Sequence, residues 1–209
     1  MDILGGMSNS NESQQVYLAF KTSHQQFFVN GEAPIEFQYL QLDPETFKSG
    51  WGRYTPAEGF EYKWDAKFGV LDAKPADDWR RAFSAWVLPQ GHAHPLMWQR
   101  FTFAESSAFN SILGSFWNQK DANQGLLPVV KYEGSKPIQV GMGNSSELSF
   151  SFGKFAPRAA EFVLPSWYTD ENAKPASDDN FVSPNAGLKD LVNERINESN
   201  SLLDESIPF

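Results

Sequence analysis

The stretch ESSAFNSILGSFW, residues 105–117, differs from the short apolar runs that make up most of the chain. Its apolar residues stand at positions 109, 112, 113, 116 and 117, which is the spacing that gathers side chains on one face of a helix. Ser106 or Ser107 precedes the first of them and is a suitable N-cap. We therefore expect one helix at residues 105–117.

Short apolar or alternating runs, separated by clusters of Gly, Pro and Asn, surround this helix on both sides. We expect strands at residues 16–21, 25–29, 35–40, 60–68, 80–88, 97–103, 127–132, 137–142, 147–153 and 160–164. One helix among many short strands is typical of a mainly β fold, here an OB-fold-like barrel with one capping helix. A β-sandwich with a single helical connection is the structural alternative.

Composition excludes several functional classes. The chain has 209 residues, of which 41% are hydrophobic and 21% charged, and it has no cysteine. Disulfides, thiolate-bound metal centres and a thiol nucleophile are therefore excluded, and the composition fits a reducing cytosol. The sequence has neither a basic, apolar leader nor an apolar run long enough to span a bilayer, so we expect a cytoplasmic protein that does not bind membranes.

Charge and aromatic residues divide the chain into two parts. Residues 16–168 contain 14 basic and 15 acidic side chains, whereas residues 169–209 contain 3 basic and 9 acidic ones. Of the 31 aromatic residues, 29 precede position 169. The overall charge of −9 therefore comes mainly from the C-terminal part, and it leaves room for a locally basic groove in the aromatic-rich part.

These differences predict four segments. Residues 1–15 lack periodicity and are expected to be a disordered N-terminus, and residues 16–168 to be the OB-like domain. Residues 169–200 are expected to be an acidic flexible linker, because their composition cannot bury enough apolar surface. Within it, residues 187–197 have the spacing of a short helix, and residues 201–209 form a separate acidic tip.

No catalytic constellation emerges from the sequence. His92 and His94 have a spacing that metal ligands use, but the flanking Gly91 and Pro95 favour a turn and no third ligand is indicated. A metal-dependent enzyme centred on these histidines is a third hypothesis, which the sequence supports with two ligands only. We expect a protein that is not an enzyme and that needs no cofactor and no metal.

Aromatic and basic residues alternate at several places in the aromatic-rich part. Single-stranded nucleic acid is bound by this combination, because bases stack on aromatic rings while Lys and Arg neutralise phosphates. Alternation along a strand would place Phe60, Tyr62 and Trp64 on one face and Lys63 on the other. Trp51, Tyr54 and Trp64 are expected to be exposed, although most rings in so aromatic a chain fill its core. The predicted DNA-contacting residues are Trp51, Arg53, Tyr54, Tyr62, Lys63, Trp64, Lys67, Arg80, Arg81 and Arg100.

The sequence ends in the acidic and apolar segment SLLDESIPF, residues 201–209. Such a tip suits a partner's pocket that accepts the terminal ring while basic residues bind the carboxylates. The predicted partner-binding residues are Asp204, Glu205, Ile207, Pro208 and Phe209.

This ending resembles that of the bacterial and bacteriophage single-stranded DNA-binding proteins, whose acidic tails end in Ile-Pro-Phe. The resemblance covers the last six to nine residues and the plan of an aromatic-rich β domain followed by an acidic linker. It implies an OB-fold that coats single strands and a tip that recruits replication, recombination and repair proteins. The tip departs from the family because Ser206 follows only two acids, Asp204 and Glu205, where the family has an uninterrupted acidic run.

The stretches 129–137 and 156–160 resemble phage proteins, which favours a phage-encoded member that acts in the cytoplasm of a bacterial host. The expected function is to coat and protect single-stranded DNA with little sequence preference, as a monomer or a homo-oligomer. The alternative is an adaptor or structural phage protein whose β domain binds protein and whose tip recruits host factors. The acidic tail is also expected to compete with DNA for the basic groove.

Overall fold

A computed structural model describes residues 16–168, and the expectations for residues 1–15 and 169–209 lie outside these residues. The described part is mainly β, with one α-helix that continues into a 3-10 turn. The strands are β1 (Tyr17–Lys21), β2 (Gln26–Val29), β3 (Ala33–Ile35), β4 (Tyr39–Leu42), β5 (Lys48–Thr55), β6 (Gly59–Trp64), β7 (Arg80–Pro89), β8 (Leu96–Arg100), β9 (Leu127–Val140) and β10 (Gly143–Ala156). The helical elements are η1 (Pro44–Thr46), α1 (Phe103–Phe116) and η2 (Trp117–Asn123).

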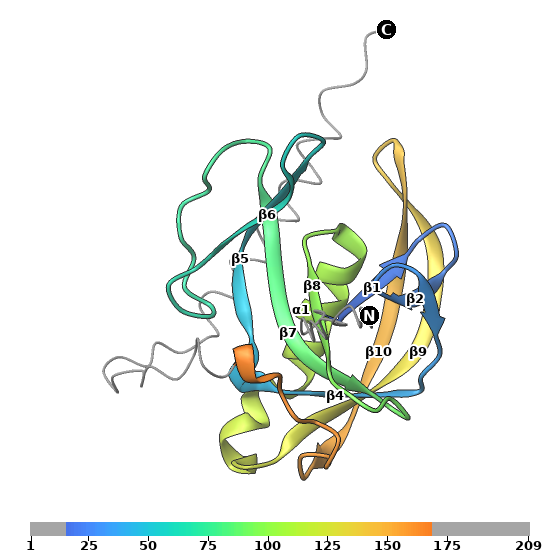
Figure 1. The fold of residues 1–209 in the computed structure, drawn as a ribbon, viewed down its shortest axis with the longest axis vertical. Helices are drawn as coiled ribbons and strands as arrows, with labels where there is room; N and C mark the ends of the chain where they lie inside the picture. Colours follow the sequence, from blue (N-terminus) through green and yellow to red (C-terminus); the bar gives the residue numbers. More distant parts are fainter. Residues whose placement is uncertain (1–15, 169–209) are drawn as a thin grey trace, which may run out of the picture.

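All ten described strands belong to one hydrogen-bonded sheet, which differs from the two sheets of the alternative sandwich. The order along the sheet is β10-β9-β4-β7-β8-β1-β2-β3, and the β5–β6 hairpin is attached to the first half of β7. Neighbouring strands are antiparallel, except that β1 runs parallel to β8. The sheet curls into a half-barrel, from which the long β9–β10 hairpin rises on one side and the β5–β6 hairpin on the other (Figure 1).

The helix begins earlier than the sequence pattern predicts. Thr102, rather than Ser106 or Ser107, is the N-cap, and its side chain accepts a hydrogen bond from the Glu105 backbone N–H. The Glu105 carboxylate in turn accepts a hydrogen bond from Thr102 Oγ1 at 2.9 Å. A Thr three residues before a Glu is a capping pair, which explains why residues 103 and 104 are helical and why the expected strand at 97–103 stops at Arg100.

The predicted helical stripe faces the main core. Phe109, Ile112, Leu113 and Phe116 are almost fully buried between the concave side of the sheet and α1. Phe83 of β7 stacks on Phe109, with ring centroids 4.2 Å apart and planes within 9°. The helix thus lies between β7 and the β9–β10 hairpin (Figure 1), and it fills the inside of the curled sheet.

A C-terminal strap, residues 157–168, covers part of the opposite, outer face of the sheet. Its Phe162 and Tyr168 join a second apolar cluster with Trp86 and Met97 of the outer face. The Ala159 backbone N–H donates to Gln41 Oε1 at 2.9 Å, which fixes the strap to β4. The expected strand at 160–164 is wrong, because this segment lies across the strands and pairs with none of them.

Other strand boundaries differ for identifiable reasons. The expected strand 35–40 is two strands, β3 and β4, and the expected strands 127–132 and 137–142 are one long strand, β9. The sequence pattern missed β5 because Gly50 and Gly52 interrupt its alternation. Both histidines of the expected turn at 91–95 do lie in a turn, between β7 and β8. None of the helices within residues 16–168 is long and apolar enough to cross a membrane.

Candidate nucleic-acid interface

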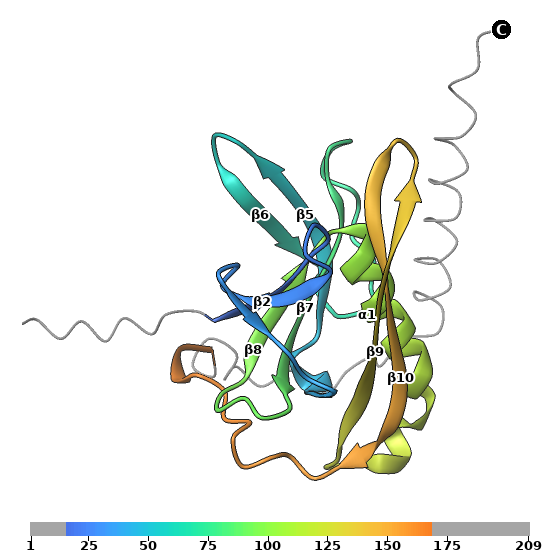
Figure 2. The same ribbon diagram turned by 90° about the vertical axis from the view of Figure 1, so that its right-hand side faces the viewer.

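Four rings of the β5–β6 hairpin and one ring that follows β8 form a continuous row, which we call the aromatic ladder: Tyr54, Phe60, Tyr62, Trp64 and Phe101. The hairpin stands away from the rest of the sheet (Figure 2). Tyr54 and Phe60 are cross-strand partners with ring centroids 4.9 Å apart. Phe101, just after β8, lies 6.0 Å from Phe60 and 5.9 Å from Tyr62. The expectation that Phe60, Tyr62 and Trp64 share one face is confirmed.

Two rings of the ladder form a parallel stack. The Tyr62 and Trp64 rings are 5.2 Å apart with planes within 9°. They pack over β5 where it carries no side chain, because Gly50 pairs with Trp64 and Gly52 pairs with Tyr62. A Cβ atom added to Gly52 would lie 2.6 Å from Phe101 Cδ1. Glycine at these two positions is therefore a requirement of the ladder.

The outer end of the ladder is open to solvent. Tyr54 is 57% exposed, as expected, and Phe60 is 65% exposed. Tyr62 and Trp64 are half-buried, so the expectation that Trp64 is exposed is not confirmed. Burial raises the pKa of Tyr62 above its ordinary value, and the nearby Arg100 charge opposes this rise. Exposed rings next to anchored ones form the kind of surface on which unstacked bases can stack.

The predicted contact residues divide between the two faces of the hairpin. Tyr54, Tyr62 and Trp64 belong to the ladder, and Arg80 shares its face because it pairs with Gly52 across the sheet. Arg80 is exposed and makes no ion pair with another residue in the described range. Arg100, at the end of β8, lies beside Tyr62 and 3.5 Å from a Glu105 carboxylate oxygen.

The opposite face of the hairpin holds four other predicted residues, Trp51, Arg53, Lys63 and Arg81. Trp51 is only 5% exposed, so the expectation that it is exposed is wrong. Its indole Nε1 donates to the Asp72 carbonyl at 3.0 Å, and the Arg81 guanidinium lies 4.7 Å from its ring centroid. Strand alternation explains this, because Trp51 points away from the face that Gly50 and Gly52 present.

The cations of this opposite face are engaged within the protein. Arg53 contacts three carboxylates, those of Glu58, Glu61 and Asp78. Hydrogen bonding to Glu61 raises the pKa of Arg53 and lowers that of Glu61. Lys63 lies over the buried Trp79 ring at 5.0 Å. These cations therefore organise the base of the hairpin and do not face the ladder.

Lys67, the last of the predicted contact residues, lies away from the ladder. It is exposed and lines a pocket of about 630 Å³ together with Phe68, Trp117 and Lys120. The structure thus brings together a smaller set than the sequence predicted. The structure adds Phe60 and Phe101 to the predicted DNA-contacting residues. Both stand in aromatic stretches of the sequence, at 60–64 and 98–103, and this pattern could have identified them.

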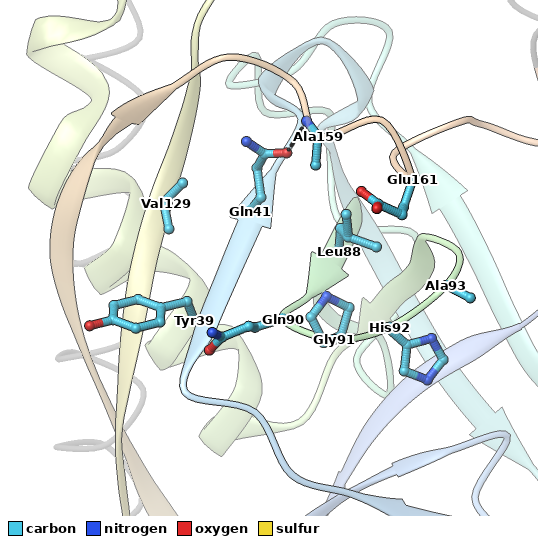
Figure 3. Close-up of a pocket in the computed structure, with 11 residues that line it drawn as sticks. Tyr39, Gln41, Leu88, Gln90, Gly91, His92, Ala93, Val129, Ala159 and Glu161 are labelled. Atoms are coloured by element: carbon cyan, nitrogen blue, oxygen red, sulfur yellow. Dashed lines mark hydrogen bonds between the residues drawn. The ribbon is translucent and has the colours of Figure 1, made fainter.

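A second pocket lies between β4, the β7–β8 turn and the strap (Figure 3). It has a volume of about 520 Å³ and is lined by Tyr39, Leu88, His92 and Glu161 among others. His94 does not line it. Within residues 16–168, no three His, Asp or Glu side chains gather as metal ligands would.

Comparisons with protein-family models, curated proteins and solved structures give no match to this chain.

Proposed function

We propose that this protein binds single-stranded DNA on the aromatic ladder, without strong sequence preference. The observation that carries the proposal is the row of five rings, which is anchored at the Tyr62–Trp64 stack and exposed at Tyr54 and Phe60. Stacking on aromatic rings tolerates every base, because every base has a π-face. The adjacent cations Arg80 and Arg100 are the phosphate contacts in this proposal.

The arrangement of strands supports an OB-like description of the body. An OB-fold is a five-stranded, partly open Greek-key barrel that binds oligonucleotides on its second and third strands and on the loops between strands 1 and 2 and between strands 4 and 5. In our proposal the combined β4–β5 segment, β7, β8, β9 and β10 are the five strands, and α1 caps the barrel between the third and fourth. The ladder then lies on the first of these loops and at the end of the third strand.

The acidic C-terminal sequence supports the same function. In this proposal residues 201–209 recruit replication, recombination or repair proteins, through Asp204, Glu205 and the terminal Ile207-Pro208-Phe209. In this proposal the 32 residues 169–200 are the flexible linker between body and tip, and this length allows the tip to reach a partner while the body holds DNA.

A titration of the full chain with poly(dT), followed by tryptophan fluorescence, tests the proposal. We expect quenching that weakens strongly with added salt, because phosphate neutralisation releases counterions. Substituting Phe60→Ala or Tyr54→Ala should cost roughly 1–3 kcal/mol of binding free energy, which is about 5- to 150-fold in Kd.

The matched control is Tyr39→Ala, which removes a ring that is 37% exposed on β4, away from the ladder. It should leave the Kd unchanged. If the wild-type chain causes no quenching at low salt, DNA coating is wrong and the alternative of a protein-binding adaptor is favoured.

A further inference from the structure

The outer face of the sheet continues beyond the ladder onto the N-terminal strands. β1 lies parallel to β8, with Tyr17 beside Met97 and Leu18 beside Trp98. Leu18 and Phe20 point into the main core, so Ala19 and Lys21 point to the outer face. By the same alternation, Gln99 of β8 and Phe101, which follows β8, point to the face of Met97. Lys21 is therefore on the same side of the sheet as Phe101 of the ladder.

Lys21 has a fixed position on this face. Its Nζ lies 4.4 Å from the centroid of the Phe28 ring on β2, and the His24 ring packs edge-on against the same ring at 5.4 Å. Phe28 is itself buried, so it supports the lysine and is not a stacking surface. Among the residues from 16 to 168, no carboxylate forms an ion pair with Lys21.

The strap and β10 are the elements that lie next to this part of the outer face. The apolar cluster of the strap includes Trp86 and Met97 of the outer face, but neither Gln99 nor Lys21, which are both half-buried. On the other side, Gln25 Nε2 donates to Ser146 Oγ at 2.7 Å and so attaches the β1–β2 turn to β10. Between the ladder and Lys21 the outer face is formed by β8 and β1, which are neighbouring strands of the same sheet.

We propose that the β1–β2 hairpin extends the single-stranded DNA interface, with Lys21 contacting a phosphate one or more nucleotides beyond the bases on the ladder. This proposal rests on the proposed function. From Phe60 on β6 to Lys21 on β1 the track crosses β5, β7 and β8, and four strand spacings amount to roughly 19 Å. Short strands would occupy the ladder alone, and only longer strands would reach Lys21.

The test compares Lys21→Ala with Lys120→Ala, which removes an equal charge from η2 at a distance from the ladder. Both full-length variants are titrated with oligo(dT) of about 4 and about 16 nucleotides, which are the limits of the site sizes seen for OB-folds. For the longer strand, Lys21→Ala should reduce the slope of log K against log salt by about 0.7, the value for one phosphate contact on a single strand. The shorter strand should bind both variants as it binds the wild-type chain.

The outcomes separate failure of the Lys21 extension from failure of DNA binding by the ladder. If Lys21→Ala matches Lys120→Ala on both lengths, the extension is wrong while DNA binding by the ladder stands. Equal weakening on both lengths also contradicts it, because Lys21 would then belong to the same subsite as the ladder. If the wild-type chain binds neither length at low salt, the proposed function fails and the extension fails with it. Urea unfolding of each variant checks that the fold is intact.

Discussion

Arg81 Nη2 donates to Asp65 Oδ2 at 2.7 Å, and both side chains are buried at the base of the β5–β6 hairpin. Arg81 Nη1 also lies 3.3 Å from Asp65 Oδ1, so the pair is bidentate. Ser49 Oγ donates to the same carboxylate at 2.6 Å. The Arg81 guanidinium, which the sequence suggested for phosphate binding, is thus committed to holding β7 against the segment that follows β6.

Breaking this pair should destabilise the fold. Removal of one partner leaves a buried charge without its counterpart, which typically costs about 3–5 kcal/mol. We therefore expect Arg81→Ala and Asp65→Ala each to lower the free energy of unfolding by about that amount, as measured by urea denaturation. Asp78→Asn is the control, because it removes an exposed partner of Arg53 and should have little effect. If Asp78→Asn and Asp65→Ala lower the free energy of unfolding equally, burial of the Arg81–Asp65 pair does not explain its contribution to stability.

Glu105 should make stability depend on pH. Its carboxylate is fully enclosed and accepts hydrogen bonds from the Phe20 backbone N–H at 2.9 Å and from Trp98 Nε1 at 3.1 Å. Burial raises its pKa above the ordinary value of 4.5, although Arg100 opposes the rise. Between the ordinary and the raised pKa the folded chain binds more protons than the unfolded chain, so the Glu105 contribution to stability falls as pH rises.

Replacement of this carboxyl group isolates its contribution. The free energy of unfolding of Glu105→Gln minus that of the wild-type chain should increase as pH is raised from 4.5 through the raised pKa of Glu105. Urea denaturation at a series of pH values measures this difference. A difference that is constant across the range would contradict the assignment, and other carboxyl groups cancel because both chains contain them.

The two glycines beneath the ladder should respond differently to an added methyl group. At Gly50 a Cβ would contact backbone atoms, the Lys63 carbonyl oxygen and Trp64 Cα, which cannot move without separating β5 from β6. At Gly52 the nearest atoms belong to the Phe101 ring, which can turn aside. Gly50→Ala should therefore lower the free energy of unfolding by about 1–3 kcal/mol, and Gly52→Ala by less.

At Gly52 the added methyl group should affect DNA binding more than stability. Gly52→Ala displaces a ring of the ladder and should weaken poly(dT) binding while the chain remains folded. Gly114→Ala is the control, because the position is in α1 and a Cβ there meets no atom within 4 Å. If Gly52→Ala binds poly(dT) as tightly as the control does, the position of Phe101 does not matter for binding.

Local pattern was sufficient for much of the architecture. The stripe at 109–117 predicted the helix, because a buried helical face needs apolar side chains at that spacing whatever packs against it. Alternation in FEYKW predicted which side chains of β6 share a face, and the turn predicted at Gly91 is confirmed. These features depend on neighbours within a few residues, which a sequence displays directly.

The sequence by itself determined the mainly β class, the single helix and the shared face of Phe60, Tyr62 and Trp64. Only the tertiary structure decided that Trp51 and Arg81 are buried on the opposite face, that Phe101 joins the ladder and that the strap covers Trp86. The physical reason is range. Alternation fixes which side chains point together, but whether a face meets solvent, an ion-pair partner or another segment depends on residues far away in the chain, as Asp65 does for Arg81 and Tyr168 for Trp86.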